Sequence, residues 1–315
     1  MIGWSCPADG AFDRPDVHKR LRRPPTNSSH NAGNMTRNAD VPVFILAGGL
    51  GTRLKEHTEF RPKPMVEIGG KPILWHIMRS YSRHGFKRFV ICSGFKSEVI
   101  KDYFANYDLM NSDFTVNLKT RNTTYHCLHH DEDWEVTVAY TGELTMTGGR
   151  IGRAAEKYLG NAEHFAVTYG DGVTNADLDA EFRFHQEHGR IGTVLAINPP
   201  SRFGDLITDG DTVLQFSEKP ELTKSWINGG FFFFRREFTD YLGTDENLVL
   251  EKGPLTALAN ARELCLWRHR GFWACMDTQR DRDELDNLWR SGKAPWALPL
   301  VKPRKTREVR VPTHA

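Results

Sequence analysis

A short glycine-rich segment directly after an apolar run constrains this chain more than any other feature. Residues 43–46 have the composition of a buried strand, and residues 47–53 follow without a break as Ala-Gly-Gly-Leu-Gly-Thr-Arg. Because glycine lacks a Cβ, the backbone can turn sharply there and bring its N–H groups close to phosphate oxygens. Arg53 and the later Lys63 add positive charge. The pattern predicts a strand followed by a loop that binds the phosphates of a nucleotide.

Two other phosphate-binding loops are excluded by their spacing. A Walker A loop needs four residues between its first glycine and a Gly-Lys-Ser/Thr triplet, and the chain has no such run. The dinucleotide fingerprint needs Gly-x-Gly-x-x-Gly at the start of a helix. Here the glycines are Gly48, Gly49 and Gly51, and Pro62 and Pro64 prevent a long helix behind them. An ordinary connection between a strand and a loop is the remaining alternative.

Beyond the loop, short apolar strands alternate with amphipathic helices. This alternation predicts an α/β fold with a Rossmann-like, mainly parallel sheet flanked by helices, over residues 41–298. Residues 106–149 are less regular and are interpreted as a small insertion that contains β-structure. Strands are expected at 88–93, 114–119, 135–140, 165–169, 193–197 and 231–234, and helices from 71, at 96–105, 150–159, 176–188, 250–260 and 281–289.

The two ends differ from this central domain. Residues 1–40 are rich in Pro, Asn, Ser and basic side chains and have no apolar periodicity. Such a segment cannot bury enough apolar surface to offset the entropy lost on ordering, so we expect a disordered N-terminal extension. Residues 299–315 are rich in Lys and Arg and are interpreted as a solvated basic tail.

Charge and hydropathy argue against several classes of partner. The formal net charge is only +2, which gives no reason to expect a nucleic-acid partner. No run approaches the roughly 18 apolar residues of a membrane span, and the N-terminus lacks the apolar core of a signal peptide. The five cysteines are scattered, as is typical of reduced thiols. We expect a cytoplasmic protein that binds neither nucleic acid nor membranes.

Two acids follow apolar segments and indicate a second part of the site. Asp171 comes after the strand at 165–169, and Asp277 likewise ends an apolar strand, within residues 273–277. Ligands of parallel sheets bind beyond the carboxyl ends of the strands, so Asp171 should lie on the same rim as the glycine loop. Mg²⁺ is usually held by one or two carboxylates together with phosphate oxygens, so both acids are candidate Mg²⁺ ligands. The alternative, in which each acid only caps a turn or a helix, stays open.

This set of residues suits phosphoryl or nucleotidyl transfer, in which the protein mainly positions the reactants and neutralises charge. Several segments together resemble the sugar-1-phosphate nucleotidyltransferases, and the resemblance runs from about Val43 to Trp296. They are Leu-Ala-Gly-Gly-Leu-Gly-Thr-Arg-Leu (46–54), Arg-Pro-Lys-Pro-Met (61–65), Tyr-Gly-Asp-Gly-Val (169–173), Glu-Lys-Pro (218–220), Asn-Gly-Gly-Phe-Phe (228–232) and Met-Asp-Thr (276–278). Met-Thr-Gly-Gly-Arg (146–150) and Gly-Lys-Ala-Pro-Trp (292–296) resemble the branch that uses CTP and glucose 1-phosphate.

The resemblance implies a nucleotidyltransferase fold of the GT-A-like type and a Mg²⁺-dependent reaction. CMP would pass from CTP to α-D-glucose 1-phosphate, giving CDP-glucose for deoxysugar or surface-polysaccharide synthesis, and pyrophosphate. Arg53 and Lys63 would be catalytic, and Asp171 and Asp277 would bind the metal. The nucleotide would contact Leu46, Ala47, Gly48, Gly49, Leu50, Gly51, Thr52, Arg53, Lys63, Thr145, Arg150 and Gly170, and the sugar phosphate would contact Glu218, Lys219, Asn228 and Gly229.

Two alternatives accompany this interpretation. The first is the same transfer with UTP, GTP or dTTP, since the choice of base depends on a few loop contacts. The second is a catalytically silent regulatory subunit that binds nucleotide sugars; the presence of all four charged residues named for catalysis and metal binding argues against it. The resemblance also implies a homo-oligomer, with residues 106–149 as the candidate partner contact.

Overall fold

The structure is a computed structural model of the 315-residue chain, and it describes residues 35–126, 132–198, 205–217 and 226–297. The described residues from Thr36 onward form one compact unit, to which all elements discussed below belong. Most of the predicted N-terminal extension and the whole of the predicted basic tail lie outside the described residues. Within the extension, Asn38–Asp40 form a short 3₁₀ helix, η2.

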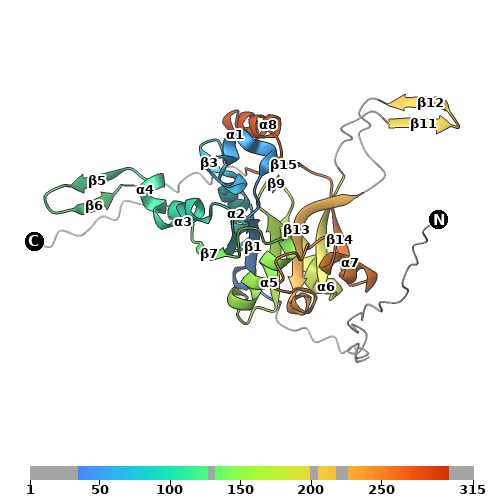
Figure 1. The fold of residues 1–315 in the computed structure, drawn as a ribbon, viewed down its shortest axis with the longest axis horizontal. Helices are drawn as coiled ribbons and strands as arrows, with labels where there is room; N and C mark the ends of the chain where they lie inside the picture. Colours follow the sequence, from blue (N-terminus) through green and yellow to red (C-terminus); the bar gives the residue numbers. More distant parts are fainter. Residues whose placement is uncertain (1–34, 127–131, 199–204, 218–225, 298–315) are drawn as a thin grey trace, which may run out of the picture. The chain divides into compact units, whose positions relative to one another are not determined.

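A seven-stranded sheet with the order β14-β10-β13-β8-β1-β4-β7 forms the centre of this unit (Figure 1). Strand β1, Pro42–Ala47, lies in its interior and pairs in parallel with β4, Arg88–Ser93, and with β8, His164–Tyr169. Strand β7, Glu135–Tyr140, continues the parallel arrangement at the edge. All six residues of β1 are buried, which explains its continuous apolar sequence.

One strand runs against its neighbours. Strand β13, Ile227–Arg235, is antiparallel to β8 and also to β10, Gly192–Ile197. Strand β14, Leu264–His269, then pairs in parallel with β10 at the other edge. The predicted α/β fold with a mainly parallel sheet is therefore confirmed, with β13 as the antiparallel strand of the central sheet.

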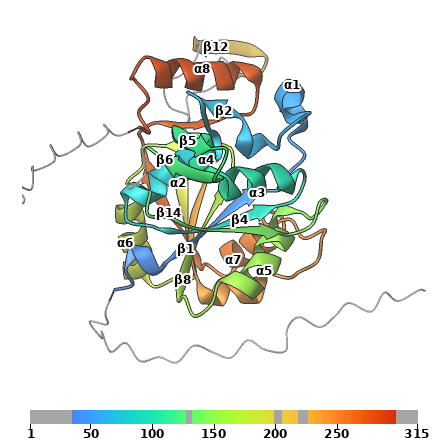
Figure 2. The ribbon, with the colours of Figure 1, turned by 90° about the vertical axis from the view of Figure 1, so that its left-hand side faces the viewer.

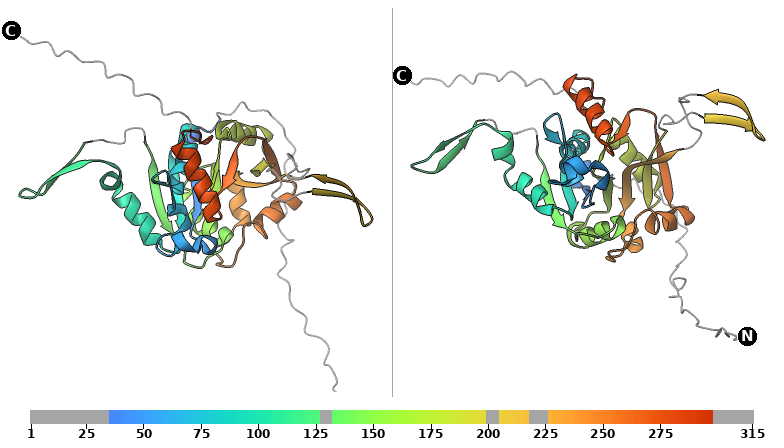
Figure 3. Two further views of the ribbon diagram at one scale, coloured as in Figure 1. Left: turned by 90° about the horizontal axis from the view of Figure 1, so that it is seen from above. Right: turned by 45° about the horizontal axis from the view of Figure 1, so that its top comes forward.

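Helices cover both faces of the sheet (Figures 2 and 3). Side chains of a strand alternate between its faces, so Val43 and Ile45 join one core while Phe44 and Leu46 join the other. The first core includes α2, Ile73–Arg83, and α6, Leu178–His188; the second includes α5, Thr147–Tyr158, and α7, Pro254–Asn260.

The remaining described elements are short helices and two-stranded ladders. No helix among the described residues is long and apolar enough to cross a membrane. The further elements are α1 (Lys55–Thr58), α3 (Ser97–Ala105), α4 (Tyr107–Asn111), α8 (Gln279–Arg290), η3 (Thr52–Leu54), η4 (Lys63–Met65), η5 (Arg236–Tyr241), and the pairs β2 (Glu67–Ile68) with β3 (Lys71–Pro72), β5 (Phe114–Asn117) with β6 (Asn122–Tyr125), β9 (Gly172–Thr174) with β15 (Trp273–Cys275), and β11 (Asp205–Asp209) with β12 (Thr212–Ser217).

Several boundaries differ from those expected from the sequence; the helix expected from 71, for example, begins at Ile73, because Lys71–Pro72 form strand β3. Residues 106–149 are not all an insertion, because β7 within them is a strand of the central sheet. Helix α5 begins at Thr147 and not at Arg150, so it includes Gly148 and Gly149. Both glycines lie against another backbone segment: a Cβ at Gly148 would be 2.9 Å from the Leu248 carbonyl oxygen, and one at Gly149 would be 2.2 Å from that of Asp245.

A carboxyl group on α6 is buried without a partner. The Glu181 side chain is fully buried, and neither of its oxygens has a hydrogen-bond partner within the part of the chain that the structure describes. Burial raises the pKa of Glu181 well above its ordinary value of 4.5, because the low-dielectric core disfavours the charged form. Burial therefore favours the protonated form of this carboxyl group in the folded protein.

We predict that Glu181→Gln weakens the dependence of stability on pH. As the pH rises above 4.5, the unfolded wild-type chain loses the Glu181 proton while the folded chain keeps it, so unfolding becomes more favourable. Glutamine cannot ionise and avoids this loss. In thermal unfolding, the Tm of the variant relative to wild type should rise by about 2–4 °C or more between pH 5 and pH 8. Parallel Tm profiles for the two proteins would contradict the prediction.

Candidate active site

The glycine loop follows directly from β1. Gly51 has a φ of +63°, in the region that side chains disfavour, and the chain then enters η3, which carries Arg53. The Gly48 carbonyl oxygen accepts hydrogen bonds from the Phe95 backbone N at 3.2 Å and from Arg150 Nη2 at 2.8 Å. A Cβ at Gly48 would lie 2.1 Å from Arg150 Nη1, so any larger residue here would displace the Arg150 guanidinium.

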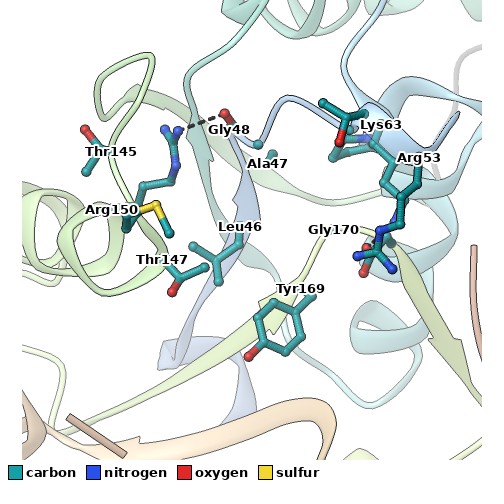
Figure 4. Close-up of a pocket in the computed structure, with 16 residues that line it drawn as sticks. Leu46, Ala47, Gly48, Arg53, Lys63, Thr145, Thr147, Arg150, Tyr169 and Gly170 are labelled. Carbon is teal, nitrogen blue, oxygen red and sulfur yellow. Dashed lines mark hydrogen bonds and ion pairs between the residues drawn. The ribbon is translucent and has the colours of Figure 1, made fainter. Parts of the chain in front are cut away.

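Arg150 holds the loop from behind. Its side chain is buried on α5, and burial lowers the pKa of its guanidinium. Figure 4 shows this guanidinium directed at Gly48. Arg150 thus ties together the ends of β1 and β4 and the loop after β7, and its predicted contact with a nucleotide stays a prediction. Its acceptors are the carbonyl oxygens of Gly48 at 2.8 Å, Ser93 at 3.2 Å, Gly142 at 2.6 Å and Glu143 at 3.0 Å, and Thr141 Oγ1 at 2.9 Å.

A cluster of four charged side chains lies beside the loop. Lys63 Nζ is 2.6 Å from Asp171 Oδ2 and 2.7 Å from Asp277 Oδ1. Arg53 Nη1 lies 2.9 Å from the other oxygen of Asp277. The Lys63 side chain is only 12 % exposed, whereas that of Arg53 is 72 % exposed. The cluster therefore has one cation held between two carboxylates and a second cation at the surface.

Local pairing explains how the two acids meet across the sequence. Asp171 lies between β8 and β9, and Asp277 lies two residues after the end of β15. Strands β9 and β15 are antiparallel partners, with Cys275 opposite Gly172. The Met276 backbone N also donates to the Asp171 carbonyl oxygen at 2.8 Å. This ladder brings Asp277 to the carboxyl end of β8, where Asp171 already is.

The charge on Lys63 is stabilised in spite of its burial. Burial alone would lower the pKa of this ammonium group. The charges and hydrogen bonds of Asp171 and Asp277 outweigh that effect, so the pKa of Lys63 is raised above its ordinary value. Lys63 therefore remains positively charged near neutral pH.

Two adjoining cavities contain most of the predicted residues. The larger, of about 370 Å³, is lined by loop residues together with Arg53, Lys63, Thr145, Arg150 and Gly170 (Figure 4). The smaller, of about 50 Å³, is lined by Asn228 and Gly229 and shares Asp171 with the larger one.

The other predicted residues lie in three different situations. Leu50 is exposed and is not part of the cavity lining. Asp277 belongs to the site through its ion pairs with Lys63 and Arg53. Glu218 and Lys219 lie outside the described residues, so their predicted contacts with the sugar phosphate stay predictions.

The structure adds three residues that were not among the predicted site residues; for Trp273 the sequence offered only packing or a position bordering the sugar. Thr147 lines the larger cavity, and Tyr169 lines both cavities. Trp273 donates from Nε1 to the Gly229 carbonyl oxygen at 2.7 Å and so braces the smaller cavity. Tyr169 and Thr147 each lie within a motif quoted above. Because Tyr169 shares its motif with Gly170 and Thr147 shares its motif with Arg150, the sequence could have indicated both as site residues.

Comparison with known proteins places the chain in a family. The family model described as nucleotidyl transferase matches residues 43–258, which include β1, the glycine loop, Lys63 and Asp171. The chain belongs to the nucleotidyl transferase family. It is therefore an enzyme, and the resemblance inferred from its motifs is confirmed.

Among the nucleotidyl transferases, two curated relatives match almost their whole length. The glucose-1-phosphate cytidylyltransferase of Salmonella typhi is 50 % identical over 258 residues, which cover 81 % of this chain and 98 % of the relative. The probable glucose-1-phosphate cytidylyltransferase of Bacillus subtilis is 40 % identical, over 82 % of this chain and 100 % of the relative. A solved UDP-glucose pyrophosphorylase in complex with UDP-glucose shares the fold, with a TM-score of 0.58, 17 % identity, and coverage of 80 % of this chain and 99 % of that one.

We predict that Gly48→Ala and Gly49→Ala differ sharply in stability, although the positions are adjacent. A Cβ at Gly48 meets the Arg150 guanidinium, whereas a Cβ at Gly49 has no atom within 4 Å among the described residues. Without ligands, Gly48→Ala should lower the free energy of unfolding by about 1–3 kcal/mol. Gly49→Ala should change it by no more than about 0.5 kcal/mol. Urea unfolding of both variants measures this, and equal losses would show that Arg150 does not set the space behind the loop.

Proposed function

We propose that this protein transfers CMP from CTP to α-D-glucose 1-phosphate, giving CDP-glucose and pyrophosphate. The 50 % identity to a glucose-1-phosphate cytidylyltransferase over nearly the whole of that relative supports this assignment. The observation that carries it is the contact of Arg53 and Lys63 with Asp171 and Asp277, beside the glycine loop. Cations, carboxylates and backbone donors on one cavity wall suit the transfer of a nucleotidyl group.

In this mechanism the sugar phosphate attacks the α-phosphorus of CTP in line. A bond forms between a phosphate oxygen of the sugar and the α-phosphorus, and the bond from that phosphorus to the bridging oxygen breaks to release pyrophosphate. The attacking phosphate is anionic near neutral pH, so no residue has to remove a proton. The loop from Leu46 to Arg53 would hold the nucleotide, and Arg53 would stabilise the leaving pyrophosphate.

Lys63 would act at the reacting centre. It lies between the two carboxylates and keeps its charge, so it can neutralise negative charge that develops on the α-phosphate. Thr145 would contact the nucleotide from the start of the segment that leads into α5, while Gly170 would lie against the nucleoside. At Gly170 a Cβ would be 2.5 Å from the Leu46 carbonyl oxygen, which supports a close approach of β8 to the loop.

Asp171 and Asp277 would hold the Mg²⁺ ion. One carboxylate oxygen of each lies within 2.7 Å of the same ammonium group, so the two acids already face a common cationic centre. Hard carboxylate oxygens, completed by substrate phosphates and water, suit Mg²⁺. When bound, the ion would add positive charge beside the phosphates and help to orient them. Asn228 and Gly229 would contribute to the sugar-phosphate pocket, together with Glu218 and Lys219.

Self-association and a cytoplasmic location remain parts of this proposal. Exposed apolar side chains within residues 107–118 support a partner contact in that segment, as the sequence predicted. They are Leu109, Met110, Phe114, Val116 and Leu118.

The choice of nucleotide is the direct test of this function. Purified protein should be assayed with glucose 1-phosphate and each of CTP, UTP, GTP and dTTP, by pyrophosphate release. We predict that CTP exceeds each of the others in kcat/KM by at least about tenfold, which corresponds to about 1.4 kcal/mol of discrimination. The same assay with a chelator in place of Mg²⁺ should show no release. A preference for another nucleotide would replace the cytidylyl assignment, and no release with any of them would favour the silent regulatory subunit.

Replacing Lys63 tests the proposed catalytic cluster. We predict that Lys63→Ala lowers kcat by on the order of a hundredfold or more, because a charge partner of the transition state is lost. Lys101→Ala, which removes an exposed lysine on α3, is the matched control and should keep wild-type turnover. Near-normal kcat in Lys63→Ala would rule out the role assigned to this lysine.

A further inference from the structure

Tyr169 lies where the two cavities meet. This last residue of β8 lines the larger cavity with Thr147 and the smaller cavity with Asn228. Its ring packs on the backbone of β13, since a Cβ at Gly230 would lie 2.4 Å from a ring carbon. Figure 4 shows the phenol ring close to Leu46 and Thr147. Tyr169 therefore forms a shared wall between the proposed nucleotide and sugar pockets.

A carboxylate outside both cavity linings holds this wall. Glu251 Oε1 accepts a hydrogen bond from the Tyr169 hydroxyl, and Oε2 accepts one from Thr147 Oγ1 at 2.9 Å. Thr147 Oγ1 in turn accepts from the Leu250 backbone N at 2.9 Å. Each hydroxyl has a single proton, and both protons are directed at Glu251. Burial and the adjacent Glu251 raise the pKa of Tyr169, so the phenol keeps its proton.

Asn228 lies beside this phenol in the lining of the smaller cavity. Asn228 Oδ1 accepts a hydrogen bond from the Gly230 backbone N at 2.7 Å, which leaves the amide nitrogen as a donor for a ligand group. The Tyr169 hydroxyl gives its proton to Glu251, so its oxygen can only accept. With Glu251 in place, these two residues therefore offer a donor, Asn228 Nδ2, and an acceptor, the Tyr169 oxygen, to a sugar hydroxyl.

We propose that Glu251 is a positioning residue that orients side chains in both substrate pockets. It orients Thr147 in the nucleotide pocket and the Tyr169 hydroxyl in the wall shared with the sugar pocket. The inference rests on the proposed function for the identity of the two substrates. Glu251 can do this because a carboxylate offers two acceptors and no donor, which fixes the direction of both hydroxyl protons.

An amide at this position would break that pattern. A glutamine would present an N–H group to Tyr169 or to Thr147, and the facing hydroxyl would have to reverse. A reversed Tyr169 hydroxyl would point its proton toward the smaller cavity and would no longer offer the same acceptor to a sugar hydroxyl. Glu251→Gln should therefore disturb both pockets while keeping size and shape.

The test compares three variants that separate the two arms of this network. Tyr169→Phe keeps the ring and removes the sugar arm, so KM for glucose 1-phosphate should rise about tenfold while KM for CTP stays within about twofold. Thr147→Val removes the nucleotide arm and should raise KM for CTP by a similar factor, with KM for glucose 1-phosphate nearly unchanged. Glu251→Gln should raise both KM values, for glucose 1-phosphate and for CTP. Wild-type turnover is measured first, so failure of the proposed function is seen independently of the variants.

Controls distinguish positioning from a general loss of structure. Glu246→Gln makes the same change at an exposed glutamate nearby in the chain and should keep both wild-type KM values. In the double variant with Glu251→Gln, the further change Tyr169→Phe should add little to KM for glucose 1-phosphate, because both act through one network. Three results would each overturn the proposal. The first is wild-type KM values in Glu251→Gln, and the second is additive effects in the double variant. The third is an equal change in both KM values that follows Tm in all three variants. If Glu251→Gln does not fold, the opposite KM effects of Tyr169→Phe and Thr147→Val decide it.

Discussion

The proposed active site depends on one positive charge between two negative ones. Asp171 and Asp277 can share a small region near neutral pH only because Lys63 lies within hydrogen-bond distance of both. The ladder between β9 and β15 supplies the geometry, and the ammonium group supplies the compensating charge. Neither is sufficient alone: without the ladder the acids would not meet, and without the cation their proximity would be unfavourable.

A second positive charge supports the opposite side of the cavity in a different way. Arg150 is bound to carbonyl oxygens and holds the glycine loop in place, whereas Lys63 faces carboxylates. Arg150 and Lys63 are both basic residues. In the structure they differ in the groups that accept their hydrogen bonds. The uncharged acceptors of Arg150 make it a structural tie, and the acidic partners of Lys63 suit the role proposed for it at the reacting centre.

The sequence predicted the parallel core and the loop because continuous apolar strands and glycines carry strong local signals. It placed Asp171 at the correct rim, since that position follows from the end of β8. It expected an apolar strand before Asp277, which is β15, but it did not predict the partner β9, whose three residues are too few for periodicity to reveal. Strand β14 was missed because its apolar run stops after four residues, before Arg268 and His269, and its residues are only partly buried. Glu251 has no motif at all, and only the folded contacts with Tyr169 and Thr147 identify it.

The direction of β13 has a consequence for how this enzyme can diversify. Because β13 is antiparallel to β8, its beginning, with Asn228, lies beside the end of β8, with Tyr169. The residues between β10 and β13 lead directly into Asn228, so sequence changes there would alter the proposed sugar-phosphate pocket before the rest of the site. The strands that lead to the glycine loop and to Asp171 need not shift. Under the proposed function, this arrangement lets the pocket for the sugar phosphate diverge while the pocket for the nucleotide stays unchanged.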